Sequence, residues 1–220
     1  LVEMVCVGAN QRLNTTRLCL SEINILSPVF GIAGKSTFTK MELVDNGDKL
    51  EFTIASRYHE ADAYQDNVQG MVSVEHRVVH ADHRYRTLLD SADAQNVNPQ
   101  TIVGACAELG GFFETARQVV VCGKTAVSRL SLSDEAGRYS GEFLLHPGIM
   151  DGVFVTAIAL ARHSGVIIDT QIIVPIYIGR LSAYQTITRK NYTAEVRIID
   201  ATADIIRFDA VLLDEDDNVV

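Results

Sequence analysis

Two hydrophobic helical segments, residues 1–11 and 150–163, each precede several short strand-like segments joined by tight turns. A turn of a few residues can connect antiparallel strands, whereas parallel strands need a long crossover. The clearest turn is Asn46-Gly47, which lies between two strand-like runs and whose residues both tolerate a positive φ. The order of elements therefore predicts an α+β fold of two units, each an antiparallel sheet curled around one buried helix.

Segments rich in apolar residues are expected to be strands, and in residues 18–26 the apolar residues recur near every second position. In the first half the expected strands are residues 18–26, 38–44, 50–56 and 69–79, and in the second half residues 119–122, 125–132, 172–178, 192–200 and 206–213. Residues between the halves are polar and rich in Asp and Asn, which predicts a linker with a short helix at 85–90, and a further helix is expected to begin at Pro99. The predicted domains are therefore residues 1–84 and 99–220, with a linker at 85–98.

The composition argues against several classes of protein. The net charge is −9, whereas phosphate binding requires clustered Lys and Arg, so nucleic acid is not an expected partner. No apolar run reaches the roughly 18 residues that cross a bilayer. The four cysteines form no CxxC pair, so we expect free thiols in a cytoplasmic protein rather than a zinc site. No glycine-rich phosphate loop or dinucleotide fingerprint is present, and neither a metal nor another cofactor is expected.

Residues 144–152, Leu-Leu-His-Pro-Gly-Ile-Met-Asp-Gly, closely resemble the HPxxxD motif of polyketide synthase dehydratase domains. Residues 174–181, 192–200 and 211–220 resemble that family's strands after the second central helix, and Leu1–Met4 resembles the start of its first central helix. The resemblance covers essentially the whole chain in order. It implies a double hot-dog fold, in which each of two antiparallel sheets wraps around a central helix.

The resemblance also implies an activity. In the family, a histidine from the first half and an aspartate from the second half remove water from a β-hydroxyacyl thioester. The substrate is carried on the phosphopantetheine arm of an acyl carrier protein, so this protein and neighbouring polyketide synthase domains are the expected partners. The resemblance also suggests a homodimer. General acid and base catalysis of this elimination needs no separate cofactor.

The resemblance assigns the acid to Asp151. A carboxylic acid keeps its proton near neutral pH only where apolar surroundings raise its pKa, and Ile149, Met150, Val153 and Phe154 surround Asp151 in the sequence. The structural alternative is an aspartate near a helix N-terminus that interacts favourably with the helix dipole.

The resemblance also suggests substrate-binding positions. Pro147 belongs to the HPxxxD block. Gly110 and Phe113 match the family's YGPxF element, whose Tyr and Pro are absent here. Phe113 would line a substrate tunnel or serve as a core aromatic. Val155 occupies the position where the family usually has Gln or His as a hydrogen-bond partner of the aspartate.

The family's catalytic histidine lies in an HxxxGxxxxP block before the first central helix, and this block is not among the 220 residues. The sequence leaves open whether it precedes Leu1 in the native polypeptide. No other histidine is a convincing substitute: His59, His76, His80 and His83 are expected at the surface, His163 at a helix end, and His146 in a structural role. Three functions remain open: a dehydratase, a catalytically inactive dehydratase-like structural domain, and a double-bond isomerase or oxygen-ring-forming cyclase.

Overall fold

The computed structural model describes residues 1–29, 34, 36–77, 79, 88, 93–99, 111–168, 171 and 173–220. The chain forms two compact units. One contains Leu1–Arg77 and Val174–Thr186, and the other contains Val78–Ile173 and Ile187–Val220. In the described part of the chain, no helix is both long enough and apolar enough to span a membrane.

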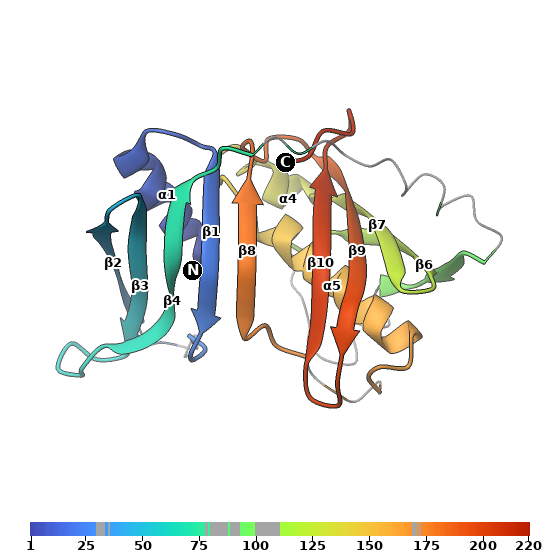
Figure 1. Cartoon of the computed structure of the whole chain (residues 1–220), viewed down its shortest axis with the longest axis horizontal. Helices are drawn as coiled ribbons and strands as arrows, with labels where there is room; N and C mark the ends of the chain where they lie inside the picture. The colour runs from blue at the N-terminus through green and yellow to red at the C-terminus, as the bar shows by residue number, and fades with distance from the viewer. Residues whose placement is uncertain are drawn as a thin grey trace. The chain divides into compact units, whose positions relative to one another are not determined.

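The described residues of the first unit form a five-stranded antiparallel sheet with one helix (Figure 1). The helix α1 (Val2–Leu13) buries Val5, Cys6 and Ala9 and contacts β1, β2 and β4. The strand order is β2-β3-β4-β1-β8. The strands are β1 (Leu18–Ile25), β2 (Phe38–Asn46), β3 (Lys49–Arg57), β4 (Gln65–Val74) and β8 (Tyr177–Ala183).

The hairpin between β2 and β3 confirms the turn predicted from the sequence. Asn46 pairs with Lys49, and Gly47 between them has a φ of +77°. The carboxylate of Asp45 accepts a hydrogen bond from the Gly47 amide at 3.2 Å. The turn therefore fixes the register, which continues without interruption to Phe38 and Arg57.

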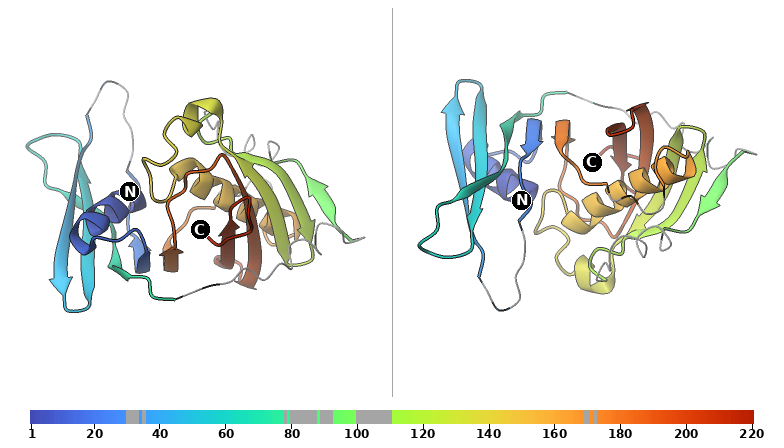
Figure 2. Two further views of the ribbon diagram at one scale, coloured as in Figure 1. Left: turned by 90° about the horizontal axis from the view of Figure 1, so that it is seen from above. Right: turned by 90° about the horizontal axis from the view of Figure 1, so that it is seen from below.

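The second unit is also an antiparallel sheet with a long helix, so both halves have the predicted α+β arrangement. Its strand order is β10-β9-β7-β6-β5. The elements are β5 (Gln95–Val97), β6 (Ala116–Cys122), β7 (Thr125–Ser131), α4 (Asp134–Gly137), α5 (Pro147–His163), β9 (Asn191–Ala201) and β10 (Ile206–Leu213). Figure 2 shows α5 lying across one face of this sheet.

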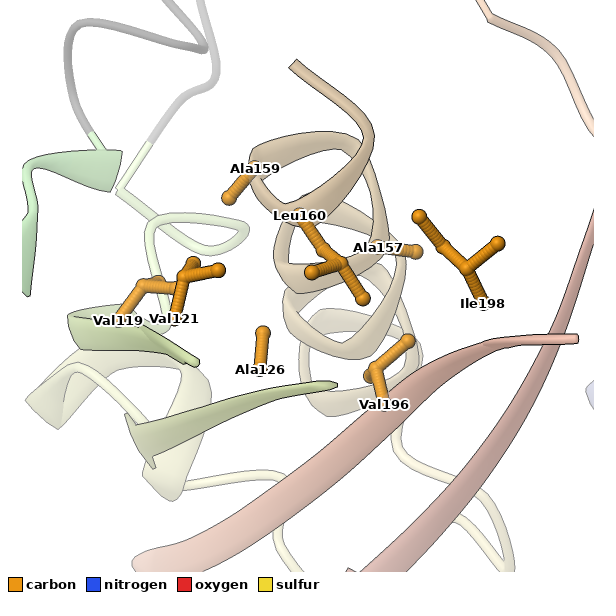
Figure 3. Packing of buried hydrophobic residues seen from close by; sticks show 8 residues of the cluster. All are labelled: Val119, Val121, Ala126, Ala157, Ala159, Leu160, Val196 and Ile198. Atoms are coloured by element: carbon orange, nitrogen blue, oxygen red, sulfur yellow. The ribbon is translucent and has the colours of Figure 1, made fainter. Parts of the chain in front are cut away.

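Close packing between α5 and the sheet forms the core of the second unit (Figure 3). The interface combines small alanine side chains with branched ones, which allows the helix to pack closely on the strands. The helix contributes Ala157, Ala159 and Leu160. The strands contribute Val119, Val121, Ala126, Val196 and Ile198.

Two predicted boundaries are wrong. The apolar pattern predicts a strand at 172–178 in a C-terminal domain of residues 99–220, but β8 covers Tyr177–Ala183 and pairs with β1 of the first unit. The predicted start includes Pro175, which has no N–H to donate to a ladder. The linker predicted at 85–98 contains β5, where Val97 pairs with Val119. The helices expected at 85–90 and from Pro99 lie mostly outside the described residues.

Candidate active site

The HPxxxD block forms the start of α5. His146 is the N-cap, and its Nδ1 atom accepts a hydrogen bond from the Gly148 amide at 3.1 Å. Pro147 occupies the first helical position, where its missing N–H removes no helical hydrogen bond. These two residues explain why the helix begins three residues before the predicted start at Met150.

His146 is a structural residue in this arrangement. Since Nδ1 accepts from an amide, the neutral ring carries its proton on Nε2, which lies 3.3 Å from the Ala136 carbonyl oxygen. Burial lowers the pKa of His146, and the side chain is fully buried. The ring stacks on Phe112 at 5.2 Å and meets Phe143 edge-on at 5.2 Å. Both nitrogens are therefore occupied, and neither is available to a substrate.

Asp151 lies one turn inside the helix, with its side chain partly buried. Because α5 begins at Pro147, Asp151 is beyond the first turn, where a carboxylate interacts most favourably with the helix dipole. Its Oδ2 atom is buried and has no hydrogen-bond partner among the described residues. Desolvation by burial raises the pKa of Asp151. The carboxyl thus keeps its proton to a higher pH than an exposed aspartate does, which is what a general acid requires.

Val155 lies four residues after Asp151 on the same side of α5 and is only 6% exposed. An aliphatic side chain at this position offers no donor or acceptor to the carboxyl. Position 155 therefore supplies no hydrogen bond to Asp151.

A segment missed by the sequence predictions packs against the first turns of α5. Thr115 is fully buried, and its hydroxyl donates a 2.7 Å hydrogen bond to the Gly148 carbonyl oxygen. The only sequence signal is the spacing of Gly148 and Gly152, which lie four residues apart and therefore on one helix face. Such spacing indicates a close approach but does not identify the neighbour.

The other predicted substrate-binding residues have different surroundings. Phe113 is 39% exposed and packs edge-on against Phe112, with ring centroids 5.2 Å apart. Gly110 lies outside the described residues. The structure therefore brings Pro147, Asp151 and Val155 together on α5, with Phe113 in the neighbouring segment.

Within the described residues of the second unit, His163 is the one histidine besides His146. His59 and His76 are exposed residues of the first unit, and His80 and His83 lie outside the described residues. His163 is exposed at the last position of α5, about 18 Å along the helix axis from Asp151.

Two cavities in the second unit lie away from Asp151. One, of about 470 Å³, lies at the end of α5 and is lined by residues including Lys124 and His163. The other, of about 390 Å³, lies over β7 and β9 and is lined by residues including Arg129 and Tyr192. Asp151 lines neither cavity, so the tunnel expected at this residue remains a prediction.

Solved structures of dehydratase domains have the same fold. The domain from the CurJ module of curacin polyketide synthase is 14% identical, with a TM-score of 0.89, over 100% of this chain and 77% of that chain. The N-terminal dehydratase of the difficidin assembly line is 17% identical, with a TM-score of 0.84, over 100% and 79% of the two chains. The dehydratase domain of RzxB from Pseudomonas fluorescens is 21% identical, with a TM-score of 0.79, over 99% and 79%.

These likenesses confirm the predicted double hot-dog fold. No curated protein matches the chain. The family model for the polyketide synthase dehydratase N-terminal domain matches residues 87–220, which is more than half of the chain and includes the HPxxxD block. The chain therefore belongs to the polyketide synthase dehydratase family.

Proposed function

We propose that this domain removes water from a β-hydroxyacyl thioester carried by an acyl carrier protein, with Asp151 as the general acid. The observation that carries the proposal is the Oδ2 atom of Asp151, which is buried without a described hydrogen-bond partner. Burial also raises the pKa of this carboxyl. A protonated carboxylic acid in such surroundings can donate to a hydroxyl group, which is otherwise a poor leaving group.

The proposed reaction is an elimination. A base removes the proton from the α-carbon, and the electrons of that C–H bond form the α,β-double bond. The bond between the β-carbon and its oxygen breaks, and the departing hydroxyl takes the proton of Asp151 to leave as water. The Asp151 carboxylate that remains is reprotonated before the next turnover.

We assign the base to none of the 220 residues. The family resemblance places it in a histidine of an HxxxGxxxxP block, which is not among these residues. Two variants of one relative support the roles of both residue types. A CurK dehydratase with histidine replaced by phenylalanine and another with aspartate replaced by asparagine are each described as inactive mutants.

Substrate contacts are proposed for the side chains around the start of α5. Pro147 and Val155 flank Asp151 on the helix, and the exposed Phe113 lies in the adjoining segment. An acyl chain would contact these apolar groups, while the phosphopantetheine arm would connect it to the carrier protein. Acid and base groups suffice for the reaction, so no other cofactor is proposed.

Product analysis tests this function. The domain, within its native polypeptide, is incubated with a 3-hydroxyacyl carrier protein and examined by mass spectrometry and NMR. We expect the acyl chain to lose the mass of one water and to gain an α,β-double bond. Recovery of unchanged substrate would contradict the proposal, and a shifted double bond or an oxygen ring would instead identify an isomerase or cyclase.

A catalytically inactive structural domain is the second candidate, and Val155 is the observation that favours it. A hydrogen-bonding residue at that position would orient the carboxyl, and the buried aliphatic side chain cannot do so. Such a domain would leave the substrate unchanged over the range of substrates tested. It would still support assembly of the neighbouring polyketide synthase domains.

A further inference from the structure

The segment that runs beside the start of α5 is held firmly to the sheet. The Thr115 amide donates to the Phe113 carbonyl oxygen at 2.8 Å, and the Ser131 amide donates to the Thr115 carbonyl oxygen at 2.8 Å. The first of these bonds closes a tight turn, and the second joins the segment to the end of β7. Residues 112–115 therefore form a hydrogen-bonded support beside the start of the helix.

Two side chains of this support contact the helix start. The Thr115 hydroxyl donates to the Gly148 carbonyl oxygen at 2.7 Å, and both residues are buried. The Phe112 ring stacks on the N-cap His146 with an interplanar angle of 21°. The first turn of α5 is thus fixed by one hydrogen bond and one ring contact from the same segment.

The two glycines of the helix make this approach possible. A Cβ atom at Gly148 would lie 2.6 Å from the Phe112 carbonyl oxygen, and one at Gly152 would lie 2.3 Å from the Thr115 hydroxyl oxygen. Both distances are well below van der Waals contact. At both glycines the helix backbone therefore lies directly against the support, at the Phe112 carbonyl oxygen and at the Thr115 hydroxyl, with no helix side chain between them.

Asp151 lies between these two contacts in the sequence. It follows Gly148 by three residues and immediately precedes Gly152, so it cannot move independently of either. We propose that Thr115 is a positioning residue, whose hydroxyl holds the first turns of α5 at the depth that keeps the Asp151 carboxyl partly buried. The effect on turnover rests on the proposed dehydratase function, whereas the effect on the carboxyl does not.

Thr156 offers a matched control. Its hydroxyl is also fully buried and lies 2.7 Å from both the Gly152 carbonyl oxygen and the Ser128 hydroxyl oxygen. It lies five residues beyond Asp151 on α5. Removing it also deletes buried hydroxyl contacts, but it leaves the bond between Thr115 and Gly148 intact.

The first measurement is turnover by Thr115→Val, Thr115→Ser and Thr156→Val within the native polypeptide. Thr115→Val keeps the shape of the side chain and loses the donor. We expect its kcat to fall by about 10- to 100-fold with little change in KM, since a small misplacement of a catalytic group has effects of this order. Thr115→Ser keeps the hydroxyl and should restore kcat to within about threefold of wild type. Thr156→Val should lower the melting temperature but not kcat.

The second measurement does not depend on turnover. The Asp151 carboxyl is followed by carbon NMR through a pH titration in each variant. Thr115→Val should bring the midpoint of this titration closer to that of an exposed aspartate, because the shifted helix lets water reach the carboxyl. Thr115→Ser and Thr156→Val should titrate as wild type does. If Thr115→Val does not fold, Thr115→Ala replaces it in both measurements.

The outcomes separate the two proposals. Absence of dehydration in the wild-type protein refutes the proposed function, and the titration then decides alone whether Thr115 positions the carboxyl. The positioning role is overturned if the Asp151 carboxyl titrates in Thr115→Val as it does in wild type. It is also overturned if Thr156→Val shifts this titration as much as Thr115→Val does. A rate loss in Thr115→Val without a titration change also counts against it.

Discussion

Asp151 and Val155 lie one helical turn apart on α5, and the buried Oδ2 atom of Asp151 has no hydrogen-bond partner in the described part of the chain. The valine removes the group that could have satisfied this atom from within the helix. Desolvation then acts on the carboxyl without compensation, and its pKa is raised. The raised pKa suits Asp151 to the proposed role of general acid. A hydrogen-bond donor in place of Val155 is therefore the direct way to change that pKa.

Introducing a hydrogen-bond donor at position 155 should lower the pKa of Asp151. In Val155→Gln the side-chain amide can donate to the ionised carboxyl, which favours the charged form. Carbon NMR titration of the Asp151 carboxyl measures the change. Burial of the amide should lower the free energy of unfolding by about 1–2 kcal/mol. Val155→Leu is the apolar control and should leave the titration unchanged, whereas an equal shift in both variants would exclude a hydrogen bond as the cause.

The raised pKa of Asp151 should also affect stability. Below the ordinary value of 3.8 the carboxyl is protonated in both the folded and unfolded states. As the pH rises above this value, the unfolded chain releases a proton that the folded protein retains, so the free energy of unfolding falls until the pH passes the folded pKa.

Asp151→Asn lacks this titration and should gain stability relative to wild type across that pH window. Urea unfolding at several pH values measures the difference. Asp209→Asn changes an exposed carboxylate and serves as the control. If Asp151→Asn and wild type keep a constant difference over the whole window, burial does not perturb the carboxyl.

The close contact at Gly152 should make alanine unfavourable there. A Cβ atom would lie 2.3 Å from the Thr115 hydroxyl oxygen and 2.9 Å from a Leu130 methyl carbon. We expect Gly152→Ala to lower the free energy of unfolding by about 1–3 kcal/mol, although alanine favours helices by about 1 kcal/mol. At Gly137 in α4 no atom lies within 4 Å of an added Cβ, so Gly137→Ala should not be destabilising. Urea unfolding measures the change of each variant relative to wild type. Equal changes in the two variants would show that the neighbours of Gly152 move aside at little cost.

Glu75 of the first unit should stabilise the pairing of β8 with β1. Its side chain is 1% exposed and accepts hydrogen bonds from the Arg77 amide at 2.8 Å, the Ser182 hydroxyl at 2.5 Å and the Arg180 guanidinium. Burial by itself raises the pKa of Glu75, but the hydrogen bonds from Ser182, Arg77 and Arg180 outweigh it and hold the pKa below its usual value.

Glu75→Gln should therefore lower the free energy of unfolding at neutral pH by about 1–3 kcal/mol. Because the folded pKa is lowered, this contribution is present above the ordinary value of 4.5 and is lost as the pH falls through the folded value. Denaturant unfolding at pH 7 and at acidic pH measures both effects. Glu42→Gln breaks an exposed pair with Lys40, and solvent screening should leave the free energy of unfolding almost unchanged. A similar loss of stability in Glu75→Gln and Glu42→Gln would show that Glu75 contributes no more than an exposed carboxylate.

Local patterns predicted much of the fold. The Asn46-Gly47 turn, with its requirement for positive φ, indicated both the hairpin and its position. The continuous apolar character of residues 150–163 indicated a buried helix, which α5 confirms. Each of these features depends on residues that are neighbours in the sequence, so a local sequence pattern is enough to predict it.

Features that depend on distant residues were not predicted. The pairing of β8 with β1 joins residues about 160 positions apart, and no local period identifies the partner of a strand. The support provided by Thr115 is similar, since a lone threonine 33 residues before Gly148 has no distinguishing pattern. The prediction of Asp151 as a candidate site residue came from a motif, and the burial of its Oδ2 atom became evident only from the fold.

The most direct test of the central claim compares wild type, Asp151→Asn and Asp209→Asn in a single turnover of a 3-hydroxyacyl carrier protein. The asparagine at position 151 keeps the size of the side chain and cannot supply the carboxyl proton. We expect wild type and Asp209→Asn to form the α,β-unsaturated product at equal rates, and Asp151→Asn to be slower by at least about 100-fold. Product formation by Asp151→Asn at the wild-type rate would show that Asp151 is not the acid.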